Sequence, residues 1–129
     1  MDADTGIPNP KFGVNGRVDL TEGLRRAANR DLDVGLTSPA LVVGDVIVVG
    51  SAHDVSFRPP SKANVKGDVR GFDVKTGKLL WTFHTIPEPN EEGFETWFND
   101  SALYTGNAGV WAPMSADPEM NLVFLPVES

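Results

Sequence analysis

The sequence predicts an all-β fold in which copies of a small sheet stack against one another. The first observation is the segment Gly71–Trp81 (GFDVKTGKLLW), which reads as a strand, a tight turn and a second strand. Gly77 suits the positive φ of such a turn, Asp73 can accept hydrogen bonds from its backbone, and Trp81 offers a large apolar ring to a neighbouring sheet. The second observation is that 13 Gly and 10 Pro favour short strands over long helices. One hairpin cannot bury both of its faces, so further copies are expected.

A partial second copy of the motif lies at the start of the chain. Asp2–Gly6 has the same spacing of Asp and Gly as Asp73–Gly77, although Pro10 stands where the second Trp would fall. The two copies are further apart than the roughly 40–50 residues of a common sheet-forming repeat, so an insertion between them is expected. The chain is predicted to begin inside a turn and to end on a strand without a partner. We therefore expect a piece of a larger protein, truncated at both ends.

The first strands are expected after an irregular start. Residues 7–19 contain several Pro and Gly residues and are predicted to form a loop. Helical spacing of Leu20, Leu24 and Ala27 predicts one short helix over residues 19–29, although Gly23 interrupts it. The clearest hairpin covers residues 39–50, where two β-branched apolar runs flank Gly44-Asp45. Such continuous apolar strands are expected to be buried on both faces.

Two further hairpins follow a polar loop over residues 51–67. The second hairpin pairs Val69–Asp73 with Leu79–His84. Residues 85–109 form a long connection, and a connection of that length is usually functional or hides an element. A third pair is predicted from Val110–Ser115 and Leu122–Val127, turning through Asp117-Pro118.

Composition narrows the class of protein. Hydrophobic residues make up 40% and charged residues 22% of the chain, as in folded globular domains. The formal net charge of −7 argues against nucleic-acid binding, which needs clustered Lys and Arg. The absence of Cys excludes disulfides and thiolate metal sites within the chain. No apolar run reaches the roughly 20 residues of a membrane span. Met1–Asp4 lacks the features of a secretory signal, so any such signal is expected outside this chain.

Several motifs, in order along the chain, resemble those of the quinoprotein dehydrogenases that use pyrroloquinoline quinone (PQQ), and the glucose dehydrogenase branch in particular. Gly71–Trp81 is similar to the family's tryptophan-docking motif, with Gly71 where Ala is usual. The other matching stretches are residues 12–20 (FGVNGRVDL), 37–39 (TSP), 50–54 (GSAHD), 83–87 (FHTIP) and 107–113 (NAGVWAP). The likeness covers nearly the whole chain.

The resemblance implies an eight-bladed β-propeller of several hundred residues, of which residues 1–129 would supply roughly one and a half to two blades. It implies a dehydrogenase that oxidises a sugar or an alcohol, with PQQ held on the propeller axis beside a Ca²⁺ ion. A quinone or a cytochrome would accept the electrons. The implied location of the full protein is the periplasm or the periplasm-facing side of the inner membrane.

Three residues are candidates for contact with the cofactor. Trp111 resembles the tryptophan that lies flat under the quinone, and a planar ring system binds well against a large aromatic face. Its alternative role is in the core or in docking of a blade. Thr37 and Ser38 precede a strand near the implied axis, where their hydroxyls could bond the carboxylates of PQQ. The alternative for both is a local turn that starts the strand.

One residue is a candidate metal ligand. Asp54 resembles a carboxylate that holds the divalent ion, and Ca²⁺ prefers hard oxygen ligands. The next position, often Asn in the family, is Val55 here, so one expected oxygen is missing. The alternative for Asp54 is an exposed loop residue. His53 and His84 are expected to be structural.

No residue matches the family's catalytic base, so we expect no catalytic residue in this chain and no activity from it alone. Two other interpretations stay open. One is a propeller that has lost its cofactor and acts as a scaffold for protein assembly. The other is an incomplete reading frame whose apolar hairpins would aggregate. Trp111 and Asp54 favour the enzyme, because a scaffold has no reason to keep a stacking Trp and an axial carboxylate together.

Overall fold

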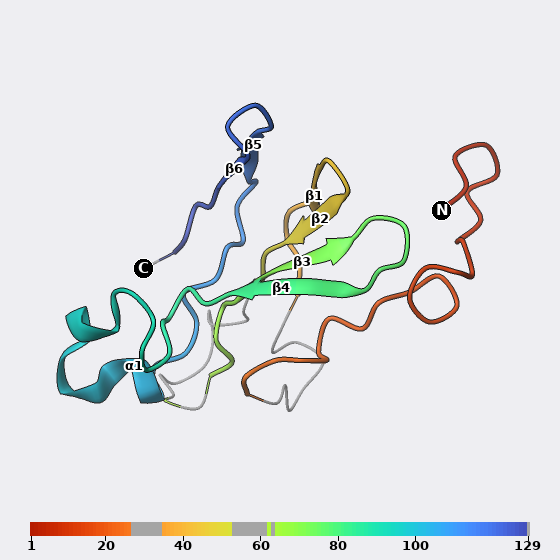
Figure 1. Cartoon of the computed structure of the whole chain (residues 1–129). Helices are drawn as coiled ribbons and strands as arrows, with labels where there is room; N and C mark the ends of the chain where they lie inside the picture. The colour runs from red at the N-terminus through yellow and green to blue at the C-terminus, as the bar shows by residue number, and fades with distance from the viewer. Residues whose placement is uncertain (27–34, 53–61, 63, 129) are drawn as a thin grey trace.

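A computed structural model describes residues 1–26, 35–52, 62 and 64–128 of the chain (Figure 1). Four strands form an antiparallel sheet in the order β1-β2-β3-β4. Their bounds are Leu41–Val43, Val46–Val49, Val69–Asp73 and Leu79–Phe83. A second sheet pairs β5 (Ser115–Asp117) with β6 (Leu122–Phe124). Among the described residues, no helix has the length and apolar character needed to cross a bilayer.

The first two predicted hairpins are confirmed. β1 and β2 pair across Gly44-Asp45, and β3 and β4 pair across the turn that contains Asp73 and Gly77. In addition, β2 pairs with β3, which joins the two hairpins into one sheet. Residues directly opposite each other in this register share a face of the sheet. Val48, Gly71 and Trp81 therefore lie on one face.

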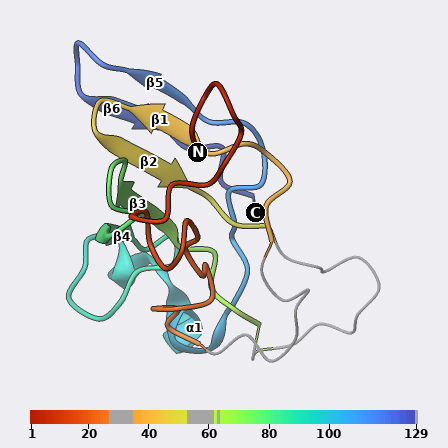
Figure 2. The same cartoon turned by 90° about the vertical axis from the view of Figure 1, so that its right-hand side faces the viewer.

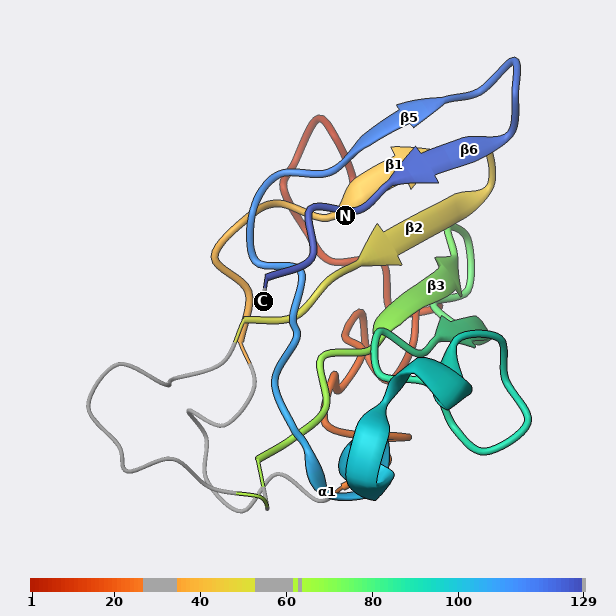
Figure 3. The same ribbon diagram turned by 90° about the vertical axis from the view of Figure 1, so that its left-hand side faces the viewer.

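The β5–β6 pair packs against that same face of the sheet (Figure 3). The buried centre of the contact is Val48, Val69 and Val110, and partly buried apolar side chains from both sheets surround it. These surrounding residues are Leu41, Val46, Met114, Val123 and Leu125. We call this the β5-facing side of the four-stranded sheet. The predicted stacking of one small sheet on another is confirmed here.

The turn between β3 and β4 and the start of the chain have the same local geometry. The Oδ1 atom of Asp73 accepts hydrogen bonds from Thr76 N (2.7 Å) and Thr76 Oγ1 (2.6 Å). Asp2 Oδ1 accepts the equivalent bonds from Thr5 N (2.8 Å) and Thr5 Oγ1 (2.6 Å). Gly77 N and Gly6 N then donate to the carbonyls of Asp73 and Asp2 at 2.8 and 2.9 Å. The repeat inferred from the Asp-to-Gly spacing is therefore also a repeat of structure.

The N-terminal segment lies along the end of the sheet that carries the β3–β4 turn (Figure 2). Gly13 N donates to Thr76 O at 2.7 Å. Gly77, with φ of +72°, is close enough to this segment that a Cβ there would lie 2.8 Å from Val18 Cγ2 and 3.1 Å from Phe12 Cε1. Gly77 thus permits both the turn and the close approach of the N-terminal segment.

Two of the predicted elements differ in the structure. The described part of the predicted helix, residues 19–26, forms turns and bends, and Gly23 adopts a φ of +75° that an α-helix cannot contain. The rest of that helix lies outside the described residues. In the third pair, β5 begins at Ser115, so residues 110–114 are irregular. Pro113 has no N–H to give a ladder, and Val110 is held by contacts described below.

The long connection over residues 85–109 contains short helical turns that the sequence did not indicate. They are η1 (Phe94–Thr96), η2 (Phe98–Asp100) and α1 (Ser101–Tyr104). Asn99 and Asp100 both have φ of 56°, which separates the turns and stops them from merging into one helix. Ala102 of α1 is fully buried, so this part of the connection is packed against the body of the chain.

Candidate functional site

Three predicted cofactor residues, Trp111, Thr37 and Ser38, come together in the structure. Thr37 Oγ1 donates to the carbonyl oxygen of Trp111 at 2.9 Å, and Ser38 Oγ donates to the same oxygen at 2.6 Å. The two segments are more than 70 residues apart in sequence. In this arrangement each hydroxyl hydrogen is already used, so the two side chains hold the backbone of Trp111. Direct contact of Thr37 and Ser38 with a cofactor stays a prediction.

The side chains of Val110 and Trp111 lie in different environments. Val110 is 3% exposed and belongs to the core that joins the two sheets, whereas Trp111 is 51% exposed. The buried neighbour therefore anchors the chain, and the two hydroxyls fix the next carbonyl. The result is a half-exposed indole on a backbone that is held from both sides. A planar ligand could stack on such an indole.

Glycines allow the backbone before Trp111 to lie directly on other backbone segments. A Cβ at Gly50 would lie 2.2 Å from Val110 O, and one at Gly67 would lie 2.4 Å from the Cα of Gly109. Hydrogen bonds join the same segments, from Gly67 N to Asn107 O (2.7 Å) and from Asn107 N to Val65 O (2.8 Å). No larger residue at 50 or 67 would permit this spacing.

The same segment also holds two residues in left-handed conformations. Asn107 has φ of 61° and Ala108 has φ of 56°. Asn adopts this region readily, but for Ala it is an uncommon conformation that costs of the order of 1 kcal/mol. Contacts with residue 128 help to hold the conformation, since Glu128 N donates to Gly109 O at 3.0 Å. Strained backbone of this kind often occurs at ligand sites.

Asp54, the predicted metal ligand, lies outside the described residues, as does His53. In the part of the chain that the structure describes, no group of three or more His, Asp or Glu side chains could hold a metal ion. Close to Asp54 in the sequence, one buried hydroxyl is available to a polar ligand. The side chain of Ser51 is buried and its Oγ has no hydrogen-bond partner among the described residues. Ser51 precedes Asp54 by three positions and follows Gly50, which contacts Val110.

A cluster of charges, mostly buried apart from Glu88, lies beside the segment that leads to Trp111. Arg25 forms ion pairs with Asp68 and Glu88, and the Asp68 side chain is only 2% exposed. Lys66 is also buried, and its Nζ donates to Ala102 O at 2.8 Å and lies 3.5 Å from Glu88 Oε1. The hydrogen bond from Arg25 lowers the pKa of the Glu88 carboxyl, while burial lowers the pKa of the Lys66 ammonium. Pairing offsets the cost of burying these charges.

Sequence reasoning missed this cluster. Its members come from three segments of the chain, and no motif marks them. The adjacent pair Arg25-Arg26 gave only a weak signal, because the chain has 11 Lys and Arg residues in all. The predicted helix over residues 19–29 hid that signal, since a helix would have placed the two side chains on its solvent face.

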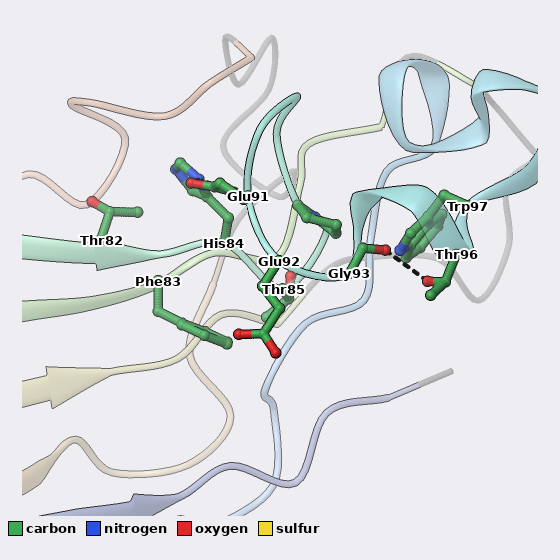
Figure 4. A pocket seen from close by; sticks show the side chains of 10 residues that line it. Thr82, Phe83, His84, Thr85, Glu91, Glu92, Gly93, Thr96 and Trp97 are labelled. Carbon is green, nitrogen blue, oxygen red and sulfur yellow. Dashed lines mark hydrogen bonds and ion pairs between the residues drawn. The ribbon is translucent and has the colours of Figure 1, made fainter.

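A separate hollow of about 390 Å³ lies between the end of β4 and the 85–97 part of the connection (Figure 4). His84 and Glu91 face each other at its edge, with His84 Nδ1 2.8 Å from Glu91 Oε1. Thr96 Oγ1 donates to Gly93 O at 2.7 Å on the other side. None of the predicted cofactor residues lines this hollow. The His84–Glu91 pair ties the end of β4 to the connection, which fits the structural role expected for His84.

Comparison with known proteins places the chain in a family. Residues 1–129 match the family described as glucose/ethanol/alcohol dehydrogenase, beta-propeller domain, which is a PQQ family. The chain is 39% identical to the quinate/shikimate dehydrogenase (quinone) of Acinetobacter baylyi, over 100% of this chain and 15% of that protein. It is 36% identical to quinoprotein glucose dehydrogenase A of Acinetobacter calcoaceticus, over 98% of this chain and 15% of that protein. No solved structure is a significant match.

The two packed antiparallel sheets, together with the family match, identify a segment of an all-β propeller, and the half-exposed Trp111 marks a candidate ligand site in it. The chain belongs to the PQQ-dependent glucose/ethanol/alcohol dehydrogenase β-propeller family. The resemblance and the fold class predicted from the sequence are thus confirmed. The chain spans about 15% of the length of the two relatives named above.

Proposed function

We propose that the chain is part of a longer PQQ-dependent dehydrogenase that oxidises the hydroxyl group of a sugar, a polyol or another alcohol. Membership of the family and the names of the relatives support this class of reaction. A third relative, 33% identical over 98% of this chain, is the glycerol dehydrogenase large subunit of Gluconobacter oxydans. Glucose, glycerol and quinate all carry secondary alcohols, so the shared chemistry is oxidation of a carbon that bears a hydroxyl.

The observation that carries the proposal is the geometry of Trp111. Its indole is 51% exposed, while its carbonyl accepts hydrogen bonds from both Thr37 and Ser38. Bound PQQ would supply the electron acceptor for the oxidation. Trp111 would give it a flat apolar surface, and Thr37 and Ser38 would keep that surface in place. A ligand surface that is fixed in advance binds with a smaller loss of conformational entropy.

We expect residues near position 54 in the sequence to bind the metal ion. Asp54 has a carboxylate of the kind that Ca²⁺ prefers. Three positions earlier in the sequence, the buried hydroxyl of Ser51 has no hydrogen-bond partner among the described residues. We propose Ca²⁺ as the ion and Asp54 as one of its ligands. The remaining ligands and the catalytic base would come from other parts of the longer protein.

We also propose an electron acceptor and a cellular location for the longer protein. The relative from Acinetobacter baylyi has a quinone in its name, which supports a quinone as the electron acceptor. A cytochrome is the alternative acceptor that the sequence resemblance implies. We place the site of action in the periplasm or at the periplasm-facing side of the inner membrane. Further Asp-xxx-Gly-xxx-Trp copies in the genomic sequence on either side would support the longer reading frame, and stop codons directly next to it would argue against it.

The test uses the full-length protein with PQQ and Ca²⁺. After desalting, quinone absorbance measures retained cofactor, and dye reduction with glucose, glycerol or quinate measures activity. Trp111→Ala should weaken retention roughly tenfold or more, because loss of a stacked aromatic face costs about 1.4 kcal/mol or more. Trp111→Phe should lose less. Asp54→Asn should raise the Ca²⁺ concentration needed for retention.

Trp97→Ala is the matched control, because Trp97 is partly exposed but lines the separate hollow. It should retain the quinone as the unmodified protein does. Failure of the unmodified protein to retain any quinone or to reduce the dye would refute the proposed function and favour a scaffold. Equal retention by the Trp111→Ala and Trp97→Ala variants would refute the role of Trp111.

A further inference from the structure

We propose that Arg25 and Arg26 form a clamp that sets the position of residues 106–111, and through it the position of the Trp111 indole. Both are positioning residues, because neither contacts Trp111. The consequence for the cofactor rests on the proposed function. The clamp itself rests on described contacts.

Arg26 joins two segments through three backbone carbonyls. Its Nη1 donates to Lys62 O and to Asn64 O, both at 2.8 Å, and its Nη2 donates to Leu103 O at 2.9 Å. Leu103 belongs to α1, which ends two residues before Gly106. One guanidinium thus fixes α1 against Lys62 and Asn64. A planar group with several N–H donors can meet three acceptors at once, which a lysine ammonium on a flexible stem does less well.

Arg25 links the segment that contains Asp68 to the start of the 85–109 connection. Its Nε donates to Asp68 Oδ2 at 2.8 Å, and its Nη1 donates to Ile86 O at 2.8 Å. The same guanidinium is paired with Glu88. Residues 64–68 are therefore held from one end by Arg26 and from the other by Arg25. Arg25 and Arg26, two consecutive residues of the N-terminal segment, thus hold the two ends of residues 64–68, a short strip of backbone.

That strip is the surface on which the segment before Trp111 lies. Asn107 exchanges hydrogen bonds with Val65 and Gly67, at 2.8 and 2.7 Å. A Cβ at Gly106 would lie 2.3 Å from Asn64 O, so this contact is also direct. Lys66 Nζ donates to Ala102 O at 2.8 Å and reinforces the link to α1. A shift of residues 64–67 would hence be passed to residues 106–109 and on to Trp111.

Two roles of Arg25 and Arg26, a general contribution to stability and a local clamp, predict different patterns of hydrogen exchange. If the arginines only stabilised the fold, their loss would lower the unfolding temperature without a local effect at residues 105–111. A clamp predicts local loosening of those residues while the rest of the protein stays protected. Hydrogen exchange separates the two, because it reports opening segment by segment.

The experiment compares Arg26→Met, Arg26→Lys and Arg17→Met in the full-length protein. Arg17 is exposed and lies in the same N-terminal segment, so it is the matched control. Hydrogen exchange is measured on peptides that cover residues 105–111, and PQQ release is followed by quinone absorbance after dilution. Arg26→Met should raise exchange of these peptides and speed PQQ release about tenfold. Arg26→Lys should rescue little of either, and Arg17→Met should match the unmodified protein.

Unchanged exchange at residues 105–111 in both Arg26 variants would refute the clamp. Faster exchange with unchanged PQQ release would refute its role in the cofactor site while the proposed function stood. If the unmodified protein retains no PQQ, the proposed function and the positioning role both fail, whatever the exchange shows. Should Arg26→Met fail to fold, Arg26→Lys keeps the charge and decides the matter in the same two measurements.

Discussion

Gly71 and Trp81 face each other across β3 and β4, and the indole of Trp81 covers the Cα of Gly71. The pair explains why this position holds no side chain. A Cβ built on Gly71 would lie 2.2 Å from Cε2 of the indole and 2.5 Å from Cζ2. Trp81 therefore packs within its own sheet, on the β5-facing side, and is still 40% exposed. The strands β5 and β6 leave the indole of Trp81 partly uncovered. The predicted contact of Trp81 with a neighbouring sheet would therefore require further strands.

Gly71→Ala should destabilise the protein because the indole has to move. Overpacking of this kind costs about 1–3 kcal/mol. The measurement is the change in unfolding free energy from chemical denaturation. Gly35→Ala is the control, since an added Cβ at Gly35 has no described atom within 4 Å and Gly35 has no positive φ; its effect should stay within about 0.5 kcal/mol. Equal effects at the two positions would show that the indole is free to rotate away.

At the same scale, residue types with strong local rules were predictable. Asp73 and Gly77 occupy the turn roles that their chemistry indicates. Trp111, Thr37 and Ser38 were brought together through a resemblance, and the sequence alone would not have paired them. Arg25 and Arg26 could not be assigned, because their acceptors are mainly backbone carbonyls and a carbonyl carries no sequence signal.

Elements with a clear local pattern were also predictable. Both β-branched runs around Gly44 became strands, as their composition and the turn between them indicate. The expected burial on both faces is wrong for β1, where Val42 is 59% exposed. Residues 110–114 are also apolar but are irregular in the structure. Tertiary contacts determine the backbone conformation here, since Val110 lies against the backbone of Gly50 and is buried with Val48 and Val69. The predicted helix failed at Gly23 for a backbone reason, its positive φ.

The link between the connection and the N-terminal segment should depend on pH through Glu88. Its hydrogen bond with Arg25 lowers the pKa of the folded carboxyl below the unfolded value of about 4.3. A lowered pKa gives stability that is present above the unfolded pKa and is lost as pH falls through the folded pKa. The loss should therefore begin near pH 5 and continue below pH 4. Glu88 is partly exposed, so solvent screening keeps the effect modest.

Glu88→Gln isolates this contribution. Denaturation midpoints of the variant and the unmodified protein should differ most at pH 7 and converge as the pH falls below about 4. Glu92→Gln is the control, because the exposed side chain of Glu92 makes no hydrogen bond among those described. A difference between Glu88→Gln and the unmodified protein that stays constant from pH 7 to pH 3 would mean that the contribution of Glu88 to stability does not depend on its ionisation.

At the scale of the whole molecule, the two sides of the four-stranded sheet are unequally covered. The β5–β6 pair covers the part of one side that includes Val48 and Val69. Trp81 and Phe83, which lie further along the same side, are 40% and 52% exposed. A sheet of two strands is narrower than the four-stranded sheet it packs on, and the outer edge of β4 has no partner strand among the described residues. In a propeller, the rest of a neighbouring blade would cover this surface.

The 129-residue chain on its own should consequently associate, because β4 combines an open strand edge with exposed aromatic side chains. Light scattering after size exclusion should show species larger than a monomer. Phe83→Lys should shift the chain toward the monomer, since a charge on the edge strand opposes pairing with another copy. Ile7→Lys is the control, because Ile7 is 63% exposed but lies outside both sheets, and it should change little. A monomeric, unmodified chain with a sharp cooperative thermal transition would mean that the two sheets bury enough surface to stand alone, and that β4 needs no neighbour.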